Sequence, residues 1–138
     1  MSAYPERLSI ALQKSGRLAD RSLELMRAAD LTVIKGNNDL LYRVENHPID
    51  LLRVRDDDIP TLVGGGVADL GVVGRNVLDE HTFANGAEPE VVMSLGFGRC
   101  DLKIAVAKAA AYDAPEALEG LKIATSYPIL LWRFLDAR

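Results

Sequence analysis

Short apolar runs alternate with stretches of helical periodicity along the chain, and this alternation is the feature that most constrains the fold. Residues 8–12, 31–34, 40–44, 49–54 and 67–73 have the length and composition of β-strands, and helical spacing of apolar residues begins at Leu18. Three later strands are expected at residues 91–95, 102–107 and 122–125, and an amphipathic helix over residues 128–135. Strands and helices in this order predict an α/β layered fold with a mostly parallel sheet.

Turn-forming residues mark where these elements end. The run from Gly36 to Asp39 predicts a turn that joins two strands as a hairpin. Three consecutive aspartates at 56–58, followed by Pro60, predict a helix start with a carboxylate cap. Glycines 64–66 would end that helix, residues 67–73 would form a buried strand, and residues 81–89 would form a loop.

The overall composition excludes several classes of protein. The chain has 138 residues, 49% of them apolar, and a net charge of −4 without a basic run, which argues against binding to nucleic acid or to an anionic membrane. The longest uncharged stretches, 59–68 and 123–132, are too short to span a bilayer. One cysteine, Cys100, permits no intrachain disulfide, and a cytoplasmic location is expected. Cys100 and Trp132 are expected to be buried.

Two strand-to-helix turns carry groups suited to an anion. Lys14, Gly16 and Arg17 stand where the first strand hands over to a helix, so they form either a phosphate cradle or a plain turn with two solvated cations. Thr125 and Tyr127 precede Pro128, and this turn either contacts a phosphate or base or simply caps a helix.

Acidic residues near strand ends give further candidates with two interpretations each. Asp69, followed by Gly74, either contacts a ligand at the carboxyl end of a strand or binds backbone N–H groups structurally. The aspartates at 56–58 could hold Mg²⁺ or ribose hydroxyls, or could cap a helix and pair with Arg53 and Arg55.

Five strings in order resemble the ATP phosphoribosyltransferase of histidine biosynthesis, in its long form more than its short form. They are ALQKSGRL at 11–18, PIDLLRVRDDDIP at 48–60, DLGVVG at 69–74, GFGRC at 96–100 and IATSYP at 123–128. The resemblance implies a two-lobed fold like a type II periplasmic binding protein. Residues 1–96 would form the first α/β lobe, and residues 97–138 the start of a second lobe that is incomplete in this chain.

The resemblance also implies a reaction and its ligands. N1 of ATP would be joined to the anomeric carbon of phosphoribosyl pyrophosphate with release of pyrophosphate and with Mg²⁺ as cofactor, and AMP would be a further ligand of a homo-oligomeric enzyme. The implied ligand-binding residues are Lys14, Gly16, Arg17, Asp69, Gly74, Thr125 and Tyr127. The family's loop for the donor 5-phosphate has no counterpart here. The alternative is therefore a truncated or degenerate member that binds adenine nucleotide or self-associates without turnover.

Overall fold

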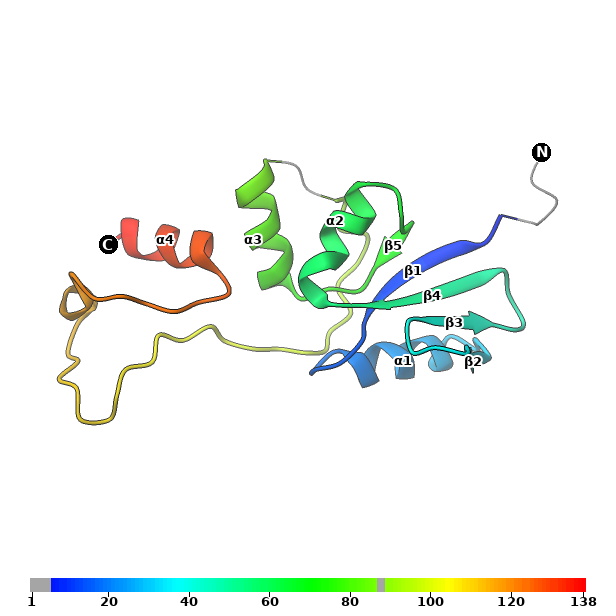
Figure 1. Ribbon diagram of the computed structural model, residues 1–138, viewed down its shortest axis with the longest axis horizontal. Helices are drawn as coiled ribbons and strands as arrows, with labels where there is room; N and C mark the ends of the chain where they lie inside the picture. The colour runs from blue at the N-terminus through cyan, green and yellow to red at the C-terminus, as the bar shows by residue number, and fades with distance from the viewer. Residues whose placement is uncertain (1–5, 87–88) are drawn as a thin grey trace.

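A five-stranded mixed sheet organises the first part of the chain (Figure 1). A computed structural model describes residues 6–86 and 89–138. The strands lie in the order β2-β3-β4-β1-β5, and their bounds are β1 Leu8–Gln13, β2 Val33–Lys35, β3 Leu41–Val44, β4 Ile49–Val54 and β5 Leu70–Gly71. β1 runs parallel to β4 and β5, whereas β2–β3 and β3–β4 are antiparallel.

The α/β class and the hairpin are therefore confirmed, but the mostly parallel sheet is not. The connections from β2 to β3 and from β3 to β4 are short turns, and a turn of that length joins only antiparallel neighbours. β5 is also shorter than the strand expected over residues 67–73. Both of its residues are exposed, because β5 lies at the edge of the sheet and not inside it.

Four helices accompany the sheet in the described part of the chain. They are α1 Ala19–Ala28, α2 Ile59–Gly64, α3 Arg75–Asn85 and α4 Pro128–Asp136, with 3-10 turns η1 Asp56–Asp58 and η2 Pro115–Leu118. Of these, α1 and α2 cover opposite faces of the sheet. Side chains of β1 alternate between the faces, so Ile10 and Leu12 pack in the same cluster as Met26 of α1. Ala11 points to the opposite face and packs in the cluster that contains Ile59 of α2.

The start of α2 differs in one detail from the expected carboxylate cap. Pro60 does lie in the first turn, but no aspartate side chain caps α2 or η1. Asp58 occupies the cap position with helical dihedral angles, φ −82° and ψ −23°. A capping side chain needs an extended backbone at that residue, and the preceding 3-10 turn removes it. The loop expected over residues 81–89 is wrong for residues 81–85, because α3 continues to Asn85 and is capped by Gly86 with φ 69°. Residues 87 and 88 of that expected loop lie outside the described residues.

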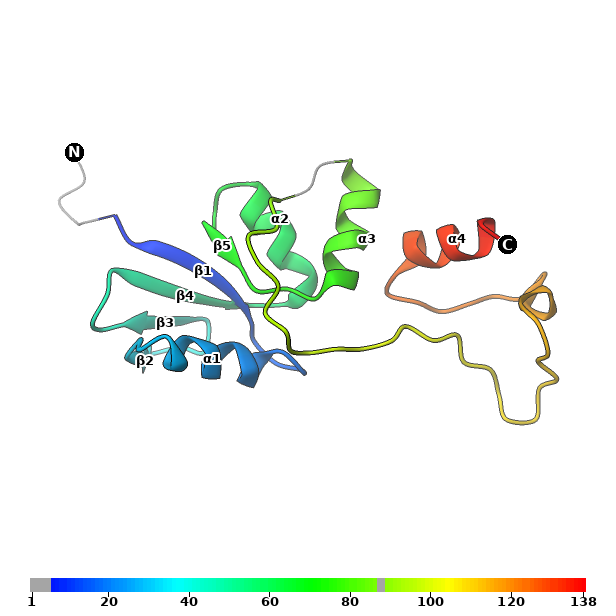
Figure 2. The same cartoon turned by 180° about the vertical axis from the view of Figure 1, so that it is seen from behind.

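A long extended segment follows α3, and Figure 2 shows it passing beside β1 before it leaves the sheet. Leu95 and Phe97 pack against the α1-side core cluster. The strands expected at 91–95, 102–107 and 122–125 do not form, because no other described segment pairs with them. Residues with high strand propensity form a ladder only when a neighbour supplies hydrogen bonds.

The chain returns through η2 to α4, which packs against α3 and not against the sheet (Figure 1). Trp132 on α4 is 62% exposed and Cys100 is exposed, so both were wrongly expected to be buried. Of the helices in the described ranges, none has the length and apolar character needed to cross a bilayer.

Candidate functional site at the carboxyl end of β1

A cavity of about 280 Å³ opens where β1 ends and α1 and α3 begin. Its walls come from the β1–α1 loop, from η1, from the start of α3 and from the residue that precedes α4. The lining residues are Gln13, Gly16, Arg17, Leu18, Asp56, Gly74, Asn76, Val77 and Tyr127. Open α/β sheets bind ligands at the carboxyl ends of their strands, and this cavity has that position.

The β1–α1 loop forms one wall, and a glycine makes its shape possible. Gly16 has φ +106°, and a Cβ on it would lie 2.7 Å from Nε2 of Gln13. The Gln13 side chain lies over the loop, where its Oε1 accepts the Leu18 N–H at 3.2 Å. Ala19 N–H donates to Gly16 O, also at 3.2 Å, and this bond begins α1. A larger residue at 16 would displace Gln13 and open the wall.

The start of α3 forms the second wall. Gly74 accepts the N–H groups of Val77 and Leu78 at 3.1 Å. A Cβ on Gly74 would lie 2.7 Å from Oδ1 of Asn76, so glycine keeps the Asn76 carboxamide close to the backbone. Asn76 brings a hydrogen-bond donor and an acceptor to the cavity.

Tyr127 closes the cavity from the far end of the chain. Burial raises the pKa of its phenol, and the Asp56 carboxylate and the Cys100 thiol act in the same direction. A hydrogen bond with Asn76 and the Arg17 guanidinium act in the opposite direction and lower that pKa. The phenol is therefore neutral at physiological pH and is able both to donate and to accept a hydrogen bond.

Four of the residues implied by the resemblance meet at this cavity, namely Gly16, Arg17, Gly74 and Tyr127. Lys14 is adjacent but not part of the lining: its N–H donates to Val54 O at 2.7 Å, and its carbonyl accepts from Arg53 Nη2 at 2.6 Å. Thr125 is also outside the lining, and its Oγ1 accepts the Tyr127 N–H at 2.9 Å.

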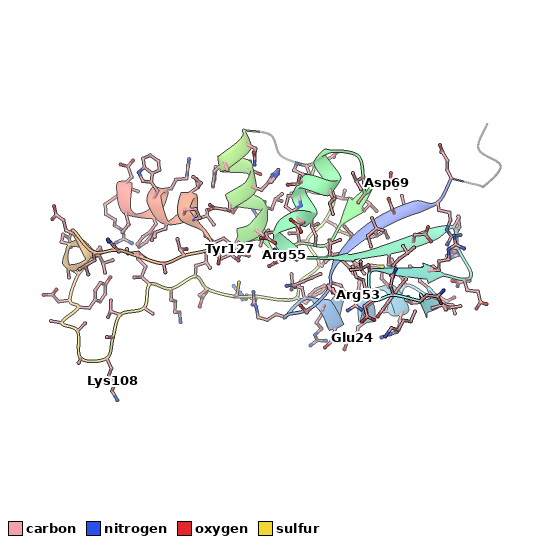
Figure 3. The ribbon with its side chains drawn as sticks, viewed as in Figure 1. Glu24, Arg53, Arg55, Asp69, Lys108 and Tyr127 are labelled. Atoms are coloured by element: carbon pink, nitrogen blue, oxygen red, sulfur yellow. The ribbon has the colours of Figure 1, made fainter. Side chains whose placement is uncertain are left out.

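Asp69 is not among the residues that line the cavity, and Figure 3 shows it well away from Tyr127, which does line it. Its Oδ2 accepts the Ser9 N–H at 2.7 Å and the Ser9 hydroxyl at 2.9 Å. These two bonds lower the pKa of Asp69. Ser9 lies near the amino end of β1, whereas the cavity follows Gln13 at the carboxyl end. The geometry thus fits the structural interpretation of Asp69, with its carboxylate holding β5 against β1.

Sequence reasoning did not single out Gln13, Asn76 or Leu18 as site residues. Gln13 and Asn76 each lie within three residues of a loop glycine, at a junction between a strand and a helix. An amide side chain close to a glycine at such a junction is therefore the sequence pattern that could have indicated these two residues. Nothing in the sequence indicates a site role for Leu18, because an apolar residue at the start of a helix is common.

The acidic groups at the site are few. Asp56 is the one carboxylate among the lining residues, and its Oδ1 also accepts the Asp57 N–H at 3.0 Å. Asp57 pairs with Arg55 at 3.3 Å. Within residues 6–86 and 89–138, no group of three His, Cys, Asp or Glu side chains has metal-binding geometry. The donor set therefore does not fit a resident Mg²⁺ ion held by protein ligands alone.

Comparison with known proteins adds a family to this geometry. Residues 55–138, more than half of the chain, match the HisG family model, described as ATP phosphoribosyltransferase. One solved structure that the chain resembles is the ATP phosphoribosyl transferase (HisG:HisZ) complex from Thermotoga maritima. The two are 29% identical with a TM-score of 0.46 over 53% of this chain and 34% of that chain, so this chain spans about a third of that length. By the family match, the chain belongs to the ATP phosphoribosyltransferase family.

Proposed function

We propose that this chain supplies the adenine-nucleotide half of an ATP phosphoribosyltransferase site. The observation that carries the proposal is the convergence of Gly16, Arg17, Gly74 and Tyr127 on one cavity from three distant parts of the sequence. The proposal includes a cytoplasmic location, which suits an exposed free thiol at Cys100.

The size and chemistry of the cavity suit part of a nucleotide. Pockets for whole drug-sized ligands have volumes of about 300–1,000 Å³, so the 280 Å³ here fits a base or a ribose and leaves the phosphates outside. The Asn76 carboxamide matches the donor and acceptor pattern of an adenine edge. Arg17, at the rim, offers the forked guanidinium that phosphates favour.

In the proposed reaction, N1 of ATP forms a bond to the anomeric carbon of phosphoribosyl pyrophosphate while the bond from that carbon to the pyrophosphate oxygen breaks. Pyrophosphate leaves with the bonding electrons. The chain's residues would orient the base, and alignment of two bound substrates accounts for much of the barrier lowering in reactions of this kind. Mg²⁺ enters this proposal as the partner of the substrate phosphates, which is how it binds in many phosphate-handling sites. The two-lobed architecture, with a first lobe over residues 1–96, is part of the same proposal.

Thermal unfolding with AMP, ATP and Mg²⁺–phosphoribosyl pyrophosphate, each added alone, tests it. A ligand that binds only the folded chain adds about 2.7 kcal/mol of stability at a hundredfold excess over its dissociation constant. We expect AMP and ATP to raise the midpoint and Arg17→Ala to reduce the shift for ATP more than for AMP. No shift with either nucleotide would refute the proposal.

A second candidate, self-association without turnover, has its own support. A compact protein of 15.0 kDa exposes about 7,000 Å², whereas this chain exposes 10101 Å². The excess of about 3,000 Å² exceeds the roughly 800 Å² that each partner buries in a standard interface. Val92 and Met93, which are 73% and 67% exposed, belong to this uncovered surface.

Light scattering on the purified chain decides this second candidate. We expect a homo-oligomer whose mass falls to that of one chain when Val92 and Met93 are both replaced by lysine. A wild-type chain that stays monomeric at high concentration would exclude it.

A further inference from the structure

The N-terminus of α4 has a complete set of hydrogen-bond partners, and the partners come from elsewhere in the chain. Pro128 has no N–H to offer. Ile129 N–H donates to Oε1 of Glu80 at 2.9 Å, and Leu130 N–H donates to Oε2 of the same carboxylate at 2.8 Å. Leu131 N–H donates to Tyr127 O at 3.0 Å. The turn before α4 is thus a capped helix start, and its donors are already occupied by a carboxylate.

Glu80 belongs to a row of three residues on α3 that all meet the segment around α4. Asn76, Glu80 and Phe83 are spaced four and three residues apart, which places them on one face of a helix. Asn76 and Tyr127 line the same cavity. Glu80 binds the first turn of α4, and the Arg133 guanidinium lies 4.0 Å from the centre of the Phe83 ring.

α4 has no buried residue of its own to hold it in place, and it has only nine residues. Helices shorter than about 12–15 residues are marginal in water unless packing holds them. A carboxylate at the helix N-terminus also interacts favourably with the helix dipole. The Glu80 carboxylate therefore binds the first turn of α4 specifically to α3.

The position of Tyr127 follows from this contact. Tyr127 precedes α4 by one residue, and the start of α3 carries the opposite wall of the cavity. We propose that Glu80 is a positioning residue: its carboxylate fixes the first turn of α4 on α3 and thereby sets Tyr127 at the mouth of the cavity. Its importance for ligand binding rests on the proposed function, whereas its hold on α4 does not.

Glu80→Ala removes both acceptors, and Glu80→Gln keeps one carbonyl oxygen and loses the charge. Glu119→Gln is the matched control, because Glu119 is exposed and lies outside α3 and α4. In the chain without ligand, we expect Glu80→Ala to speed hydrogen exchange at the Ile129 and Leu130 amides by roughly tenfold or more, as expected from loss of a charge-assisted hydrogen bond. Glu80→Gln should lie between Glu80→Ala and wild type.

Two readouts separate positioning from general loosening. Trp132 is the only tryptophan and lies on α4, so its fluorescence anisotropy should fall when α4 is released. The pKa of Tyr127 should move back toward its usual range, because the phenol leaves its partly buried position. Arg133→Gln gives an independent release of α4 with the carboxylate intact, and its effect on amide exchange should be smaller, about twofold to fivefold.

AMP is the probe for the coupling to the cavity. Its affinity should fall in Glu80→Ala and stay at the wild-type value in Glu119→Gln. Unchanged amide exchange in Glu80→Ala would overturn the inference, and so would faster exchange with an unchanged Tyr127 pKa. If wild type itself binds no AMP, the proposed nucleotide function fails, and the exchange and Tyr127 readouts still decide the role of Glu80.

Discussion

We expect Gly98→Ala to disturb the cavity by displacing the Leu18 side chain. Gly96→Ala is the matched control. The two glycines have almost the same left-handed backbone, with φ +71° and φ +72°. Alanine at either position therefore carries a similar conformational cost of roughly 1 kcal/mol. Their surroundings differ: a Cβ on Gly98 would lie 2.2 Å from Cδ2 of Leu18, whereas a Cβ on Gly96 would have no atom within 4 Å.

The difference between the two variants isolates the contact with Leu18. Leu18 is buried and lines the cavity, so a methyl group on residue 98 pushes its side chain toward the space that a ligand would occupy. Overpacking of this kind costs about 1–3 kcal/mol. We expect Gly98→Ala to be less stable than Gly96→Ala by about 1 kcal/mol, because the cavity gives Leu18 room to move, and to bind AMP more weakly.

Urea unfolding followed by circular dichroism measures the stability difference, and calorimetric titration measures AMP affinity. Equal midpoints for the two variants would refute the reasoning, since they would mean that residues 96–98 do not pack on the β1–α1 loop.

Three further predictions concern the core, an acidic group and the site tyrosine. Leu51→Ala should lower the free energy of unfolding by about 2–5 kcal/mol, because Leu51 is fully buried. Leu40 is 53% exposed, so Leu40→Ala should change that free energy by less than about 0.5 kcal/mol in the same urea assay. The folded-state pKa of Asp69 lies below its ordinary value, so its contribution is present at neutral pH and is lost as pH falls through that lowered pKa. Asp69→Asn should therefore flatten the acid limb of a stability–pH curve and leave AMP affinity unchanged. The pKa of Tyr127 is raised, so its carbon-13 ring signal, assigned with Tyr127→Phe, should titrate above the usual range. A normal titration would contradict the partial burial of the phenol at the cavity.

The strands of the sheet and the helices on its faces could be predicted because their signals are local. Alternating burial along β3, the turn at Gly36 and the proline at the start of α2 each depend on residues within a short stretch of sequence. The short turns on either side of β3 also indicate that β3 is antiparallel to its neighbours. The expectation of a mostly parallel sheet did not take this into account.

The segment after α3 could not be predicted in the same way. Residues 91–95 and 102–107 have strand composition, yet a strand needs a partner, and whether one exists is a non-local fact. The exposure of Trp132 has the same origin, because a residue's burial depends on what packs against its helix. The role of Glu80 could not be predicted for a related reason, because Glu80 caps a helix whose bonded residue is 49 positions away in the sequence.

The site was predictable to the extent that glycines and cations mark the loops at strand ends. The cavity brings together Gly16, Arg17, Gly74 and Tyr127. Asp69 is not among them, because it lies just before a strand, and that end of the sheet is opposite the end at which residues follow a strand. To predict this difference, the first and last residues of the strand must be known to within one or two positions. The periodicity of apolar residues does not locate strand ends that closely.

The most direct test of the proposed function is a residue-by-residue map of AMP binding. Amide chemical shifts of the nitrogen-15-labelled chain would be followed as AMP is added. Binding at the cavity predicts saturable shifts at Gly16, Arg17, Gly74 and Asn76, with Ser9 and Asp69 unmoved. Shifts centred on Ser9 and Asp69, or the absence of saturable shifts, would contradict the assignment of this cavity to adenine nucleotide.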